Sequence, residues 1–235
     1  MKYLAIYLAL LAYSGAAQLS AQPVDEIVNK YIEALGGKEK LLSIKTIKME
    51  GSLGVQGLEV GVTVTAVHMV GTRTDIAVPG MGEGFQIVNT TTGWNFMPFQ
   101  GQASPQEITD AQHKASVNQL DVHGVLVNYS EKGHQVELLG KEMIEGAECY
   151  KLKVVNKEGK IYTLYIDTKT YYRVKSITNS PGAGGETETA TTYSDFKKTP
   201  DGYVFPFTQS NARGTILFTS IEVNKPVNES IFKVE

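Results

Sequence analysis

Residues 90–120 read TTTGWNFMPFQGQASPQEITDAQHKASVNQL, and this stretch contains the change of pattern that decides the fold. A polar turn at 90–93 leads into a short aromatic strand at 94–99. The next segment, Ser104-Pro105-Gln106-Glu107, has the form of a capping box, in which the serine accepts hydrogen bonds from the first helical turn and the glutamate reaches back. The stretch therefore predicts a helix that begins at Ser104.

The sequence on both sides of this stretch alternates between apolar and polar residues, as half-buried antiparallel strands do. The segments with this pattern are 46–53, 59–70, 73–78, 85–89, 135–144, 147–155, 161–167, 171–178, 187–196 and 215–223. A helix among antiparallel strands must lie across a face of the sheet, because it does not connect parallel strands. We therefore expect a single α+β domain of about eleven or twelve antiparallel strands with a helix across one face of the sheet. If the sheet curves, that helix covers its concave side.

A first helix is expected at 23–35. Apolar residues recur there from Val24 to Leu35 at the spacing of one helical face. Gly36-Gly37 should end this helix, because glycine accepts positive φ. One or two further helical turns at 38–43 should follow before the strands begin.

The N-terminus has the layout of a secretory signal peptide, with a basic residue, an apolar run and then small residues. We expect residues 1–21 to form the signal peptide, with cleavage before Gln22, and residues 22–235 to form the mature domain. Leu19-Ser20-Ala21-Gln22 resembles a lipobox except that Gln22 replaces the cysteine that would carry lipid. The mature chain should therefore be soluble rather than anchored.

Composition and charge narrow the functional classes. The chain has 22 basic and 25 acidic residues and a formal net charge of −3. It shows no basic stripe, so nucleic acid is not an expected partner. Cys149 is the only cysteine, which excludes an intramolecular disulfide and a metal cage built on thiolates.

Sequence motifs for catalysis are missing. The chain has no nucleophile elbow, no His-Glu-x-x-His, no dinucleotide glycine motif and no calcium loop. Its histidines, His68, His113, His123 and His134, are scattered, and none forms a helical i, i+4 pair with another. We therefore expect no enzyme activity, no cofactor and no metal site.

What remains is a set of apolar residues spread over many strands, consistent with a pocket on a bent sheet. The expected cavity residues are Val62, Val64, Trp94, Phe96, Leu164 and Phe205. The alternative is that each of them is ordinary core, and periodicity does not choose between the two. A glycine-rich loop at 79–84 presents Met81, which we expect with Arg73 at the lid or rim of the pocket.

Two segments resemble the periplasmic lipoprotein carrier (LolA-like) superfamily of outer-membrane lipoprotein-sorting proteins. Gly93-Trp94-Asn95-Phe96-Met97-Pro98 is similar to a conserved aromatic segment of that family, and residues 223–232, VNKPVNESIF, are similar to its closing strand and tail. The resemblance implies a strongly curved open antiparallel sheet, an unclosed half-barrel of about 11 strands, with helices covering its concave face. It also implies binding of acyl chains in the periplasm of a Gram-negative bacterium. Its implied partners are a lipid or an acylated lipoprotein, with membrane-bound donor and acceptor proteins, and the implied state is a monomer.

The sequence departs from the family at one place. Lipoprotein carriers have an Arg-Pro pair after the second long strand, where the arginine latches the lid, whereas residues 69–74 here read MVGTRT. Arg73 either takes that role from the next strand or is a surface or rim residue. Two functions stay open: a carrier or binding protein for acyl chains, and a periplasmic interaction or sensor module whose apolar concave face docks a partner protein.

Overall fold

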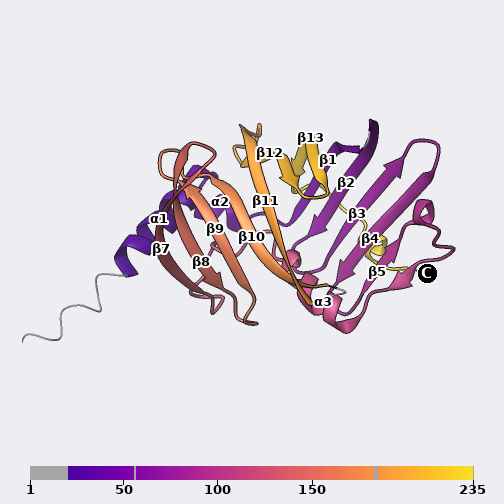
Figure 1. Ribbon diagram of the computed structural model, residues 1–235, viewed down its shortest axis with the longest axis horizontal. Helices are drawn as coiled ribbons and strands as arrows, with labels where there is room; N and C mark the ends of the chain where they lie inside the picture. Colours follow the sequence, from indigo (N-terminus) through magenta and orange to yellow (C-terminus); the bar gives the residue numbers. More distant parts are fainter. Residues whose placement is uncertain (1–20, 56, 183–184, 235) are drawn as a thin grey trace, which may run out of the picture.

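The computed structural model describes residues 21–55, 57–182 and 185–234 (Figure 1). Residues 1–20 of the predicted signal peptide lie outside the described residues. Within the described ranges, no helix is both long enough and apolar enough to cross a membrane.

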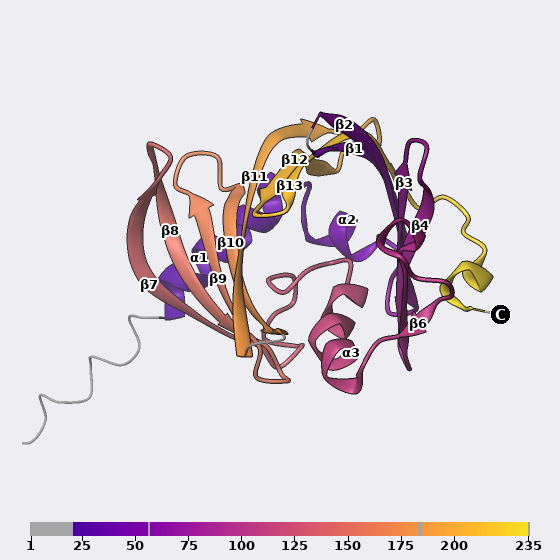
Figure 2. The same cartoon turned by 45° about the vertical axis from the view of Figure 1, so that its right-hand side comes forward.

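One antiparallel sheet of thirteen strands forms the body of the molecule, in the order β6-β5-β4-β3-β2-β1-β13-β12-β11-β10-β9-β8-β7. The pairing of β1 with β13 joins the N-terminal and C-terminal halves. The sheet is open and strongly curved, as predicted, and has two strands more than the eleven expected (Figure 2). Its strands are β1 (Thr46–Val55), β2 (Leu58–Val67), β3 (Gly71–Val78), β4 (Gly82–Asn89), β5 (Gly93–Phe96), β6 (Gln106–Glu107), β7 (Gln135–Ile144), β8 (Ala147–Val155), β9 (Ile161–Asp167), β10 (Arg173–Gly182), β11 (Gly185–Lys198), β12 (Val204–Asn211) and β13 (Gly214–Val223).

The strand order explains why a helical segment covers the concave side. The consecutive strands β6 and β7 lie at opposite edges of the sheet, so the chain between them must cross from one edge to the other. It crosses inside the curve, through α3 (Asp110–Ser116), the 3₁₀ helix η2 (Val117–Leu120) and a loop at 121–134 (Figure 2). We call residues 108–134 the crossing segment.

The predicted start of the central helix at Ser104 is wrong. Gln106 and Glu107 instead pair with Asn95 and Trp94 as the short edge strand β6. The helix begins at Asp110, after a capping box in which Gln112 N–H donates to Thr109 Oγ1 and Thr109 N–H donates to Gln112 Oε1. The capping motif was thus correct in kind, but the free edge of β5 takes up the earlier segment as a strand.

The N-terminal helices occur where the periodicity predicts them. α1 (Ala21–Ala34) buries Val24, Ile27, Val28 and Ile32, and α2 (Lys38–Leu42) buries Leu41. Both pack in the main core of the molecule, which also contains residues from the crossing segment and from β8, β9 and β13. Burying apolar side chains is the main favourable term in folding, so α1 is firmly held to the sheet.

Bulges help to bend the sheet. The pairing of β1 with β13 shifts register between Glu50 and Gly51, and the pairings of β7 with β8 and of β9 with β10 also shift. Bulges increase local twist and curve a strand. Gly51 is required at the first of these, because a Cβ there would lie 2.3 Å from the main-chain oxygen of Leu217.

A second, smaller core lies on the outer, convex face. There Phe232, from the 3₁₀ helix η3 (Glu229–Phe232), packs with Val67 and Ile87. Gly71 allows this contact, since a Cβ on Gly71 would lie 2.5 Å from Cγ of Phe232. The C-terminal turn therefore covers the back of β3 and β4, opposite to the side that α3 covers (Figure 2).

Candidate functional site

The pairing of the strands divides the expected cavity residues between the two faces of the sheet. Directly paired residues share a face, and faces alternate along a strand. Val62 and Val64 pair with Gly51 and Met49 of β1, which carry the row onto the face occupied by α1, α2 and the crossing segment. Val62 and Val64 are therefore on the concave face, where the sequence placed them.

Leu164 and Phe205 share this concave face but differ in their surroundings. Leu164 is 1% exposed and lies in the closed core among residues of α1 and β8. Phe205 is only partly buried and packs at the margin of the same core. Phe205 thus lines a cavity, whereas Leu164 is a core residue.

Trp94 and Phe96 do not belong to this surface, and their expected place in the cavity is wrong. They pair with Ile87 and Phe85, whose row continues through Arg73 on β3, and this row faces the C-terminal turn. Trp94 packs in the small convex core around Phe232, and the rings of Phe85 and Phe96 lie 5.6 Å apart.

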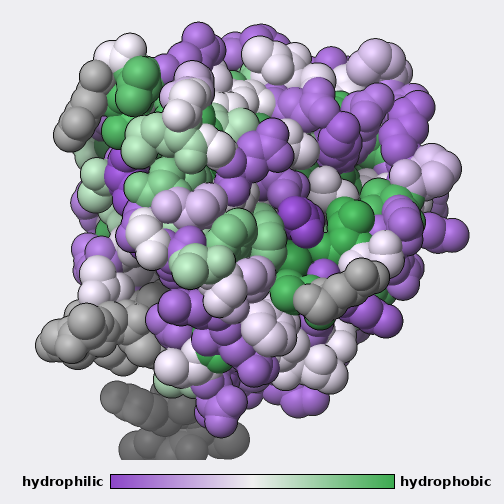
Figure 3. Space-filling model, turned by 90° about the vertical axis from the view of Figure 1, so that its right-hand side faces the viewer, coloured by the Kyte–Doolittle hydropathy of each residue, from purple (hydrophilic) through white to green (hydrophobic). Residues whose placement is uncertain are grey.

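Arg73 and Met81 do not meet at a pocket mouth. The Arg73 guanidinium lies 4.5 Å from the ring centre of Phe85 and donates to the Ile231 carbonyl, so it fixes the C-terminal turn on the convex face. Met81 is 55% exposed in the turn between β3 and β4. Figure 3 faces this end of the molecule and shows hydrophobic side chains in separate patches among hydrophilic ones.

A cavity of about 150 Å³ lies between the helices and the concave face. Its lining includes Tyr31 of α1, Leu35 directly after that helix, Val122 of the crossing segment, and Arg173 and Phe205 of the sheet. The cavity therefore lies where the crossing segment, the N-terminal helices and the sheet meet.

Arg173 gives this mostly apolar cavity a positive charge. Among the described residues, the ion pairs do not include Arg173, whose guanidinium stacks 4.4 Å from the ring centre of Tyr193. Burial by itself would lower the pKa of Arg173, but Tyr193 and Tyr31 raise it above its ordinary value. The cavity thus holds a guanidinium that stays charged beside two tyrosine rings.

A larger cavity of about 380 Å³ opens under α3. It lies between Lys114 and Ala115 of α3 and the turn that joins β8 to β9, with Ile161 on its wall. Lys160 Nζ donates to the Ala115 carbonyl at 2.7 Å, and burial lowers the pKa of Lys160. This cavity is an opening beneath the cover, with one lysine held at its edge.

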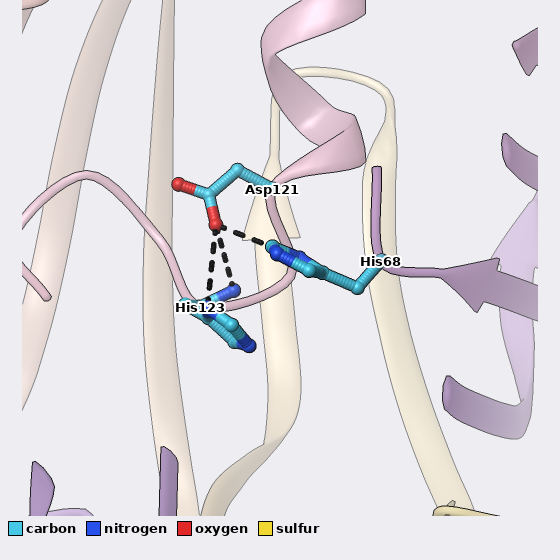
Figure 4. Close-up of side chains that lie close together, drawn as sticks. All are labelled: His68, Asp121 and His123. Atoms are coloured by element: carbon cyan, nitrogen blue, oxygen red, sulfur yellow. Dashed lines mark hydrogen bonds and ion pairs between the residues drawn. The ribbon is translucent and has the colours of Figure 1, made fainter. Parts of the chain in front are cut away.

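Three residues that the sequence did not connect come together at the start of the loop after η2. His68, from the turn after β2, lies beside Asp121 and His123 of the crossing segment (Figure 4). Their ligand atoms all lie within 4.8 Å of one another. The short spacing of Asp121 and His123 was a visible signal, but nothing in the sequence pointed to His68. Arg173 was also missed, because a single arginine in a strand has no pattern.

Cys149 lies in an environment that disfavours a reactive thiolate. Its side chain is fully buried, and burial raises the pKa of its thiol, with Asp167 and Glu148 adding to the effect. The thiolate is the reactive form of cysteine, so a raised pKa keeps Cys149 inert.

Three solved structures share this fold at low sequence identity. A DUF1329 family protein from Desulfovibrio piger has a TM-score of 0.56 and 13% identity, and the match covers 90% of this chain and 97% of that one. A LolA superfamily protein from Nitrosomonas europaea has a TM-score of 0.55 and 14% identity, covering 92% and 98%. A proposed outer membrane lipoprotein-sorting protein domain from Vibrio parahaemolyticus has a TM-score of 0.53 and 14% identity, covering 90% and 97%.

Similarity of this chain to known proteins is found in structure and not in sequence. A scan against protein-family models finds no match, and a search of the curated proteins finds none. The predicted LolA-like fold is confirmed by the three structures, which cover nearly the whole chain.

Proposed function

From the LolA-like fold, we propose that this chain is a periplasmic carrier or binding protein that holds an acyl chain of a lipid or lipoprotein on its concave face. The observation that carries the proposal is the cavity between helices and sheet, in which apolar walls surround the charged Arg173. Ligand sites are typically apolar clefts with a few placed polar groups. The proposed contacts from the sheet are Val62, Val64 and Phe205, with Arg173 at the polar end of the ligand.

The charge of Arg173 favours an amphiphile with an anionic head group. A guanidinium can bind a carboxylate or phosphate through two parallel hydrogen bonds, and such pairs are stronger than neutral ones. Tyr31 and Tyr193 lie close enough to influence the pKa of Arg173. A fatty-acid carboxylate or a lipid phosphate would meet all three groups.

The size of the cavity implies that the cover must move to admit a chain. A volume of about 150 Å³ suits a molecule about the size of benzene, and an acyl chain needs more room. The crossing segment lines this cavity through residues 122–124, and its part suited to move first is α3, because none of the residues of α3 is buried, whereas α1 buries four. Elements with few buried apolar contacts open at low free-energy cost.

The energetics fit a carrier. Each methylene buried away from water contributes about 0.8 kcal/mol, so a long acyl chain does not cross an aqueous compartment unshielded. Two of the structures that share this fold are described as a LolA superfamily protein and a lipoprotein-sorting domain. These descriptions support a lipid or lipoprotein as cargo and the periplasm as the compartment.

The decisive experiment compares a charged substitution on the concave face of the sheet with the same substitution on the convex face, which serves as the control. The mature protein is purified from the periplasm, and bound material is identified by native mass spectrometry and organic extraction. We expect near-stoichiometric lipid or acylated peptide in the wild type, and at least a tenfold lower occupancy in Phe205→Asp. Phe96→Asp places the same charge on the convex face and should keep the cargo.

Two results would reject the proposal. One is protein purified without lipid that also fails to take up fatty acids or phospholipids in solution. The other is equal loss of cargo in Phe205→Asp and Phe96→Asp at equal folded fraction. A partner chain recovered by crosslinking from cells, with no extractable lipid, would instead favour the interaction module.

A further inference from the structure

His68, Asp121 and His123 form a compact cluster at the junction of the sheet and the crossing segment (Figure 4). Nδ1 of His68 lies 3.8 Å from Asp121 Oδ1, and Nδ1 of His123 lies 3.9 Å from the same oxygen. The two imidazole rings stack with centres 3.9 Å apart and a tilt of 23°. All three residues are partly or largely buried.

The proton on His123 can be placed from its partners. Nε2 of His123 lies 3.0 Å from the main-chain oxygen of Ile44, which only accepts hydrogen bonds, so Nε2 must carry the proton. In the neutral ring Nδ1 then presents a lone pair toward Asp121. Two lone-pair atoms therefore face each other across this contact.

His68 contributes a further ring nitrogen to the cluster. Its Nδ1 is buried and has no hydrogen-bond partner among the described residues. Buried polar atoms are nearly always satisfied, so an unpaired ring nitrogen beside a carboxylate calls for an explanation.

We propose that these three side chains bind one divalent transition-metal ion of the zinc class. Two imidazole nitrogens and one carboxylate oxygen are a standard partial ligand set for zinc, with a fourth position left for water or another ligand. Imidazole ligands favour zinc, copper or nickel over magnesium and calcium. The metal would sit between Asp121 Oδ1 and the two Nδ1 atoms.

The outer contacts of the cluster match those of metal sites. Histidine ligands usually donate their other ring N–H to a carbonyl or carboxylate, as His123 does to Ile44. Lys132 forms an ion pair with Oδ2 of Asp121 and also donates to the Gly124 carbonyl at 3.0 Å. Oδ2 is thereby held in place, while Oδ1 accepts one hydrogen bond, from the main-chain N–H of His123 at 3.1 Å, and keeps a lone pair for the ion.

The geometry requires only a small adjustment. Ligand atoms about 2.0–2.1 Å from a tetrahedral ion lie about 3.4 Å from each other. The two nitrogen–oxygen separations of 3.8 and 3.9 Å exceed this by less than the reach of a side-chain rotation. The stacked rings must also turn so that their Nδ1 atoms converge on one point.

The bound ion would link parts of the chain that are distant in sequence. His68 follows β2, Asp121 and His123 belong to the crossing segment, and Ile44 precedes β1. Met69 N–H already donates to the Leu120 carbonyl at 2.8 Å beside the cluster. An ion would therefore fasten the crossing segment to the sheet. The ion site does not require the proposed lipid cargo, although His123 also lines the cavity proposed for that cargo.

The test titrates the metal-free mature protein with Zn²⁺ by calorimetry and repeats the titration with Co²⁺, whose visible absorption reports ligand geometry. We expect one ion per chain, a Tm that rises with Zn²⁺, and at least a tenfold weaker affinity in His68→Ala. The control is His134→Ala, because His134 also bonds a main-chain oxygen of the crossing segment, that of Val125, but lies outside the cluster.

A measurement on the wild type guards against unfolding of the variants. In a histidine ¹⁵N spectrum, Zn²⁺ should shift Nδ1 of His68 and His123 and leave the nitrogens of His113 and His134 unchanged. Binding that survives His68→Ala, binding that His134→Ala weakens equally, or Nδ1 signals that do not move would each overturn the proposal.

Discussion

Arg73 on β3 donates from Nη1 to the main-chain oxygen of Ile231 at 3.1 Å, which ties β3 to the C-terminal turn on the convex face. Its Nε also donates to Asp75 at 2.7 Å. The one arginine that the sequence offered as a lid latch is thus committed to the side of the sheet away from the cover.

Replacing Arg73 should therefore loosen the C-terminus and leave cargo binding unchanged. We expect Arg73→Ala to lower the free energy of unfolding by about 1–2 kcal/mol, because a charged hydrogen bond to a main-chain oxygen is lost. Urea denaturation measures the loss, and faster amide exchange at 229–232 locates it. Arg213→Ala, at an exposed turn, should neither lower the stability nor speed this exchange. A drop in lipid occupancy in Arg73→Ala would instead support a role of Arg73 as the lid latch.

Gly71 and Phe232 should be energetically coupled. Gly71→Ala puts a methyl group into the Phe232 ring and should destabilise the protein by about 1–3 kcal/mol. Phe232→Ala should cost about 3–5 kcal/mol, because the side chain is 2% exposed. In the double variant the clash is gone, so its loss of stability should be smaller than the sum. Strict additivity would contradict the packing described for the convex core.

Substitutions can distinguish Thr109, the N-cap of α3, from Ser104, the N-cap that the sequence predicted. Thr109→Ala removes the side-chain acceptor for Gln112 N–H and should destabilise α3 by about 0.5–2 kcal/mol, seen as faster amide exchange in residues 110–116. Ser104→Ala should leave these amides unchanged, because Ser104 precedes the edge strand β6. Equal effects of the two variants would restore the helix start that the sequence suggested.

Arg173 should determine the preference for an anionic head group. We expect Arg173→Gln to weaken binding of a fatty acid at least tenfold, while binding of the uncharged methyl ester changes little. Lys175→Gln is the matched control, because Lys175 pairs with Tyr165 and so lies on the opposite face of the sheet from Leu164. A parallel loss of acid and ester would assign Arg173 to structure rather than to recognition.

Asp167 should make the stability depend on pH in the acid range. Burial alone would raise the pKa of Asp167, but hydrogen bonds from the backbone of Thr170 and Lys169 and from the Thr170 hydroxyl hold the pKa below its ordinary value. The folded pKa is lower than the unfolded one, so this stabilisation is present above the unfolded pKa and is lost as pH falls through the folded pKa.

The variant Asp167→Asn isolates this effect. It should lower the free energy of unfolding by about 1 kcal/mol at pH 7, through loss of the charged acceptor, and the difference from wild type should shrink toward zero at low pH. Urea denaturation at several pH values checks this. The exposed Asp201→Asn serves as control, and a difference that stays constant with pH would contradict the assigned role.

Elements held by local pairing could be predicted from the sequence. The ranges predicted for β7, β8 and β9 agree with the observed bounds, because adjacent strands joined by short turns specify their own pairing. Glu145 and Gly146 take up the positive φ that the first of these turns requires. The helix start at Ser104 failed because an unpaired strand edge competed for the same residues.

The candidate site could be predicted only in part. Val62, Val64, Leu164 and Phe205 lie on the concave face, and their contact with a ligand stays a prediction. Trp94 and Phe96 lie on the convex face. A period of two separates a strand into two faces, but it does not say which face is inside. That assignment depends on the register of every strand between β1 and β5, which no local pattern records.

The sequence by itself determined the fold class: antiparallel strands joined by short turns, an N-terminal amphipathic helix and a helical segment in the middle of the chain. These follow from side-chain periodicity and turn chemistry, which act over a few residues. Tertiary structure alone decided which face is covered, that Arg173 lines a cavity, and that His68 meets Asp121 and His123. The physical reason is that β6 and β7 are at opposite edges of the sheet, so the chain between them had to cross its concave side and bring distant residues into contact.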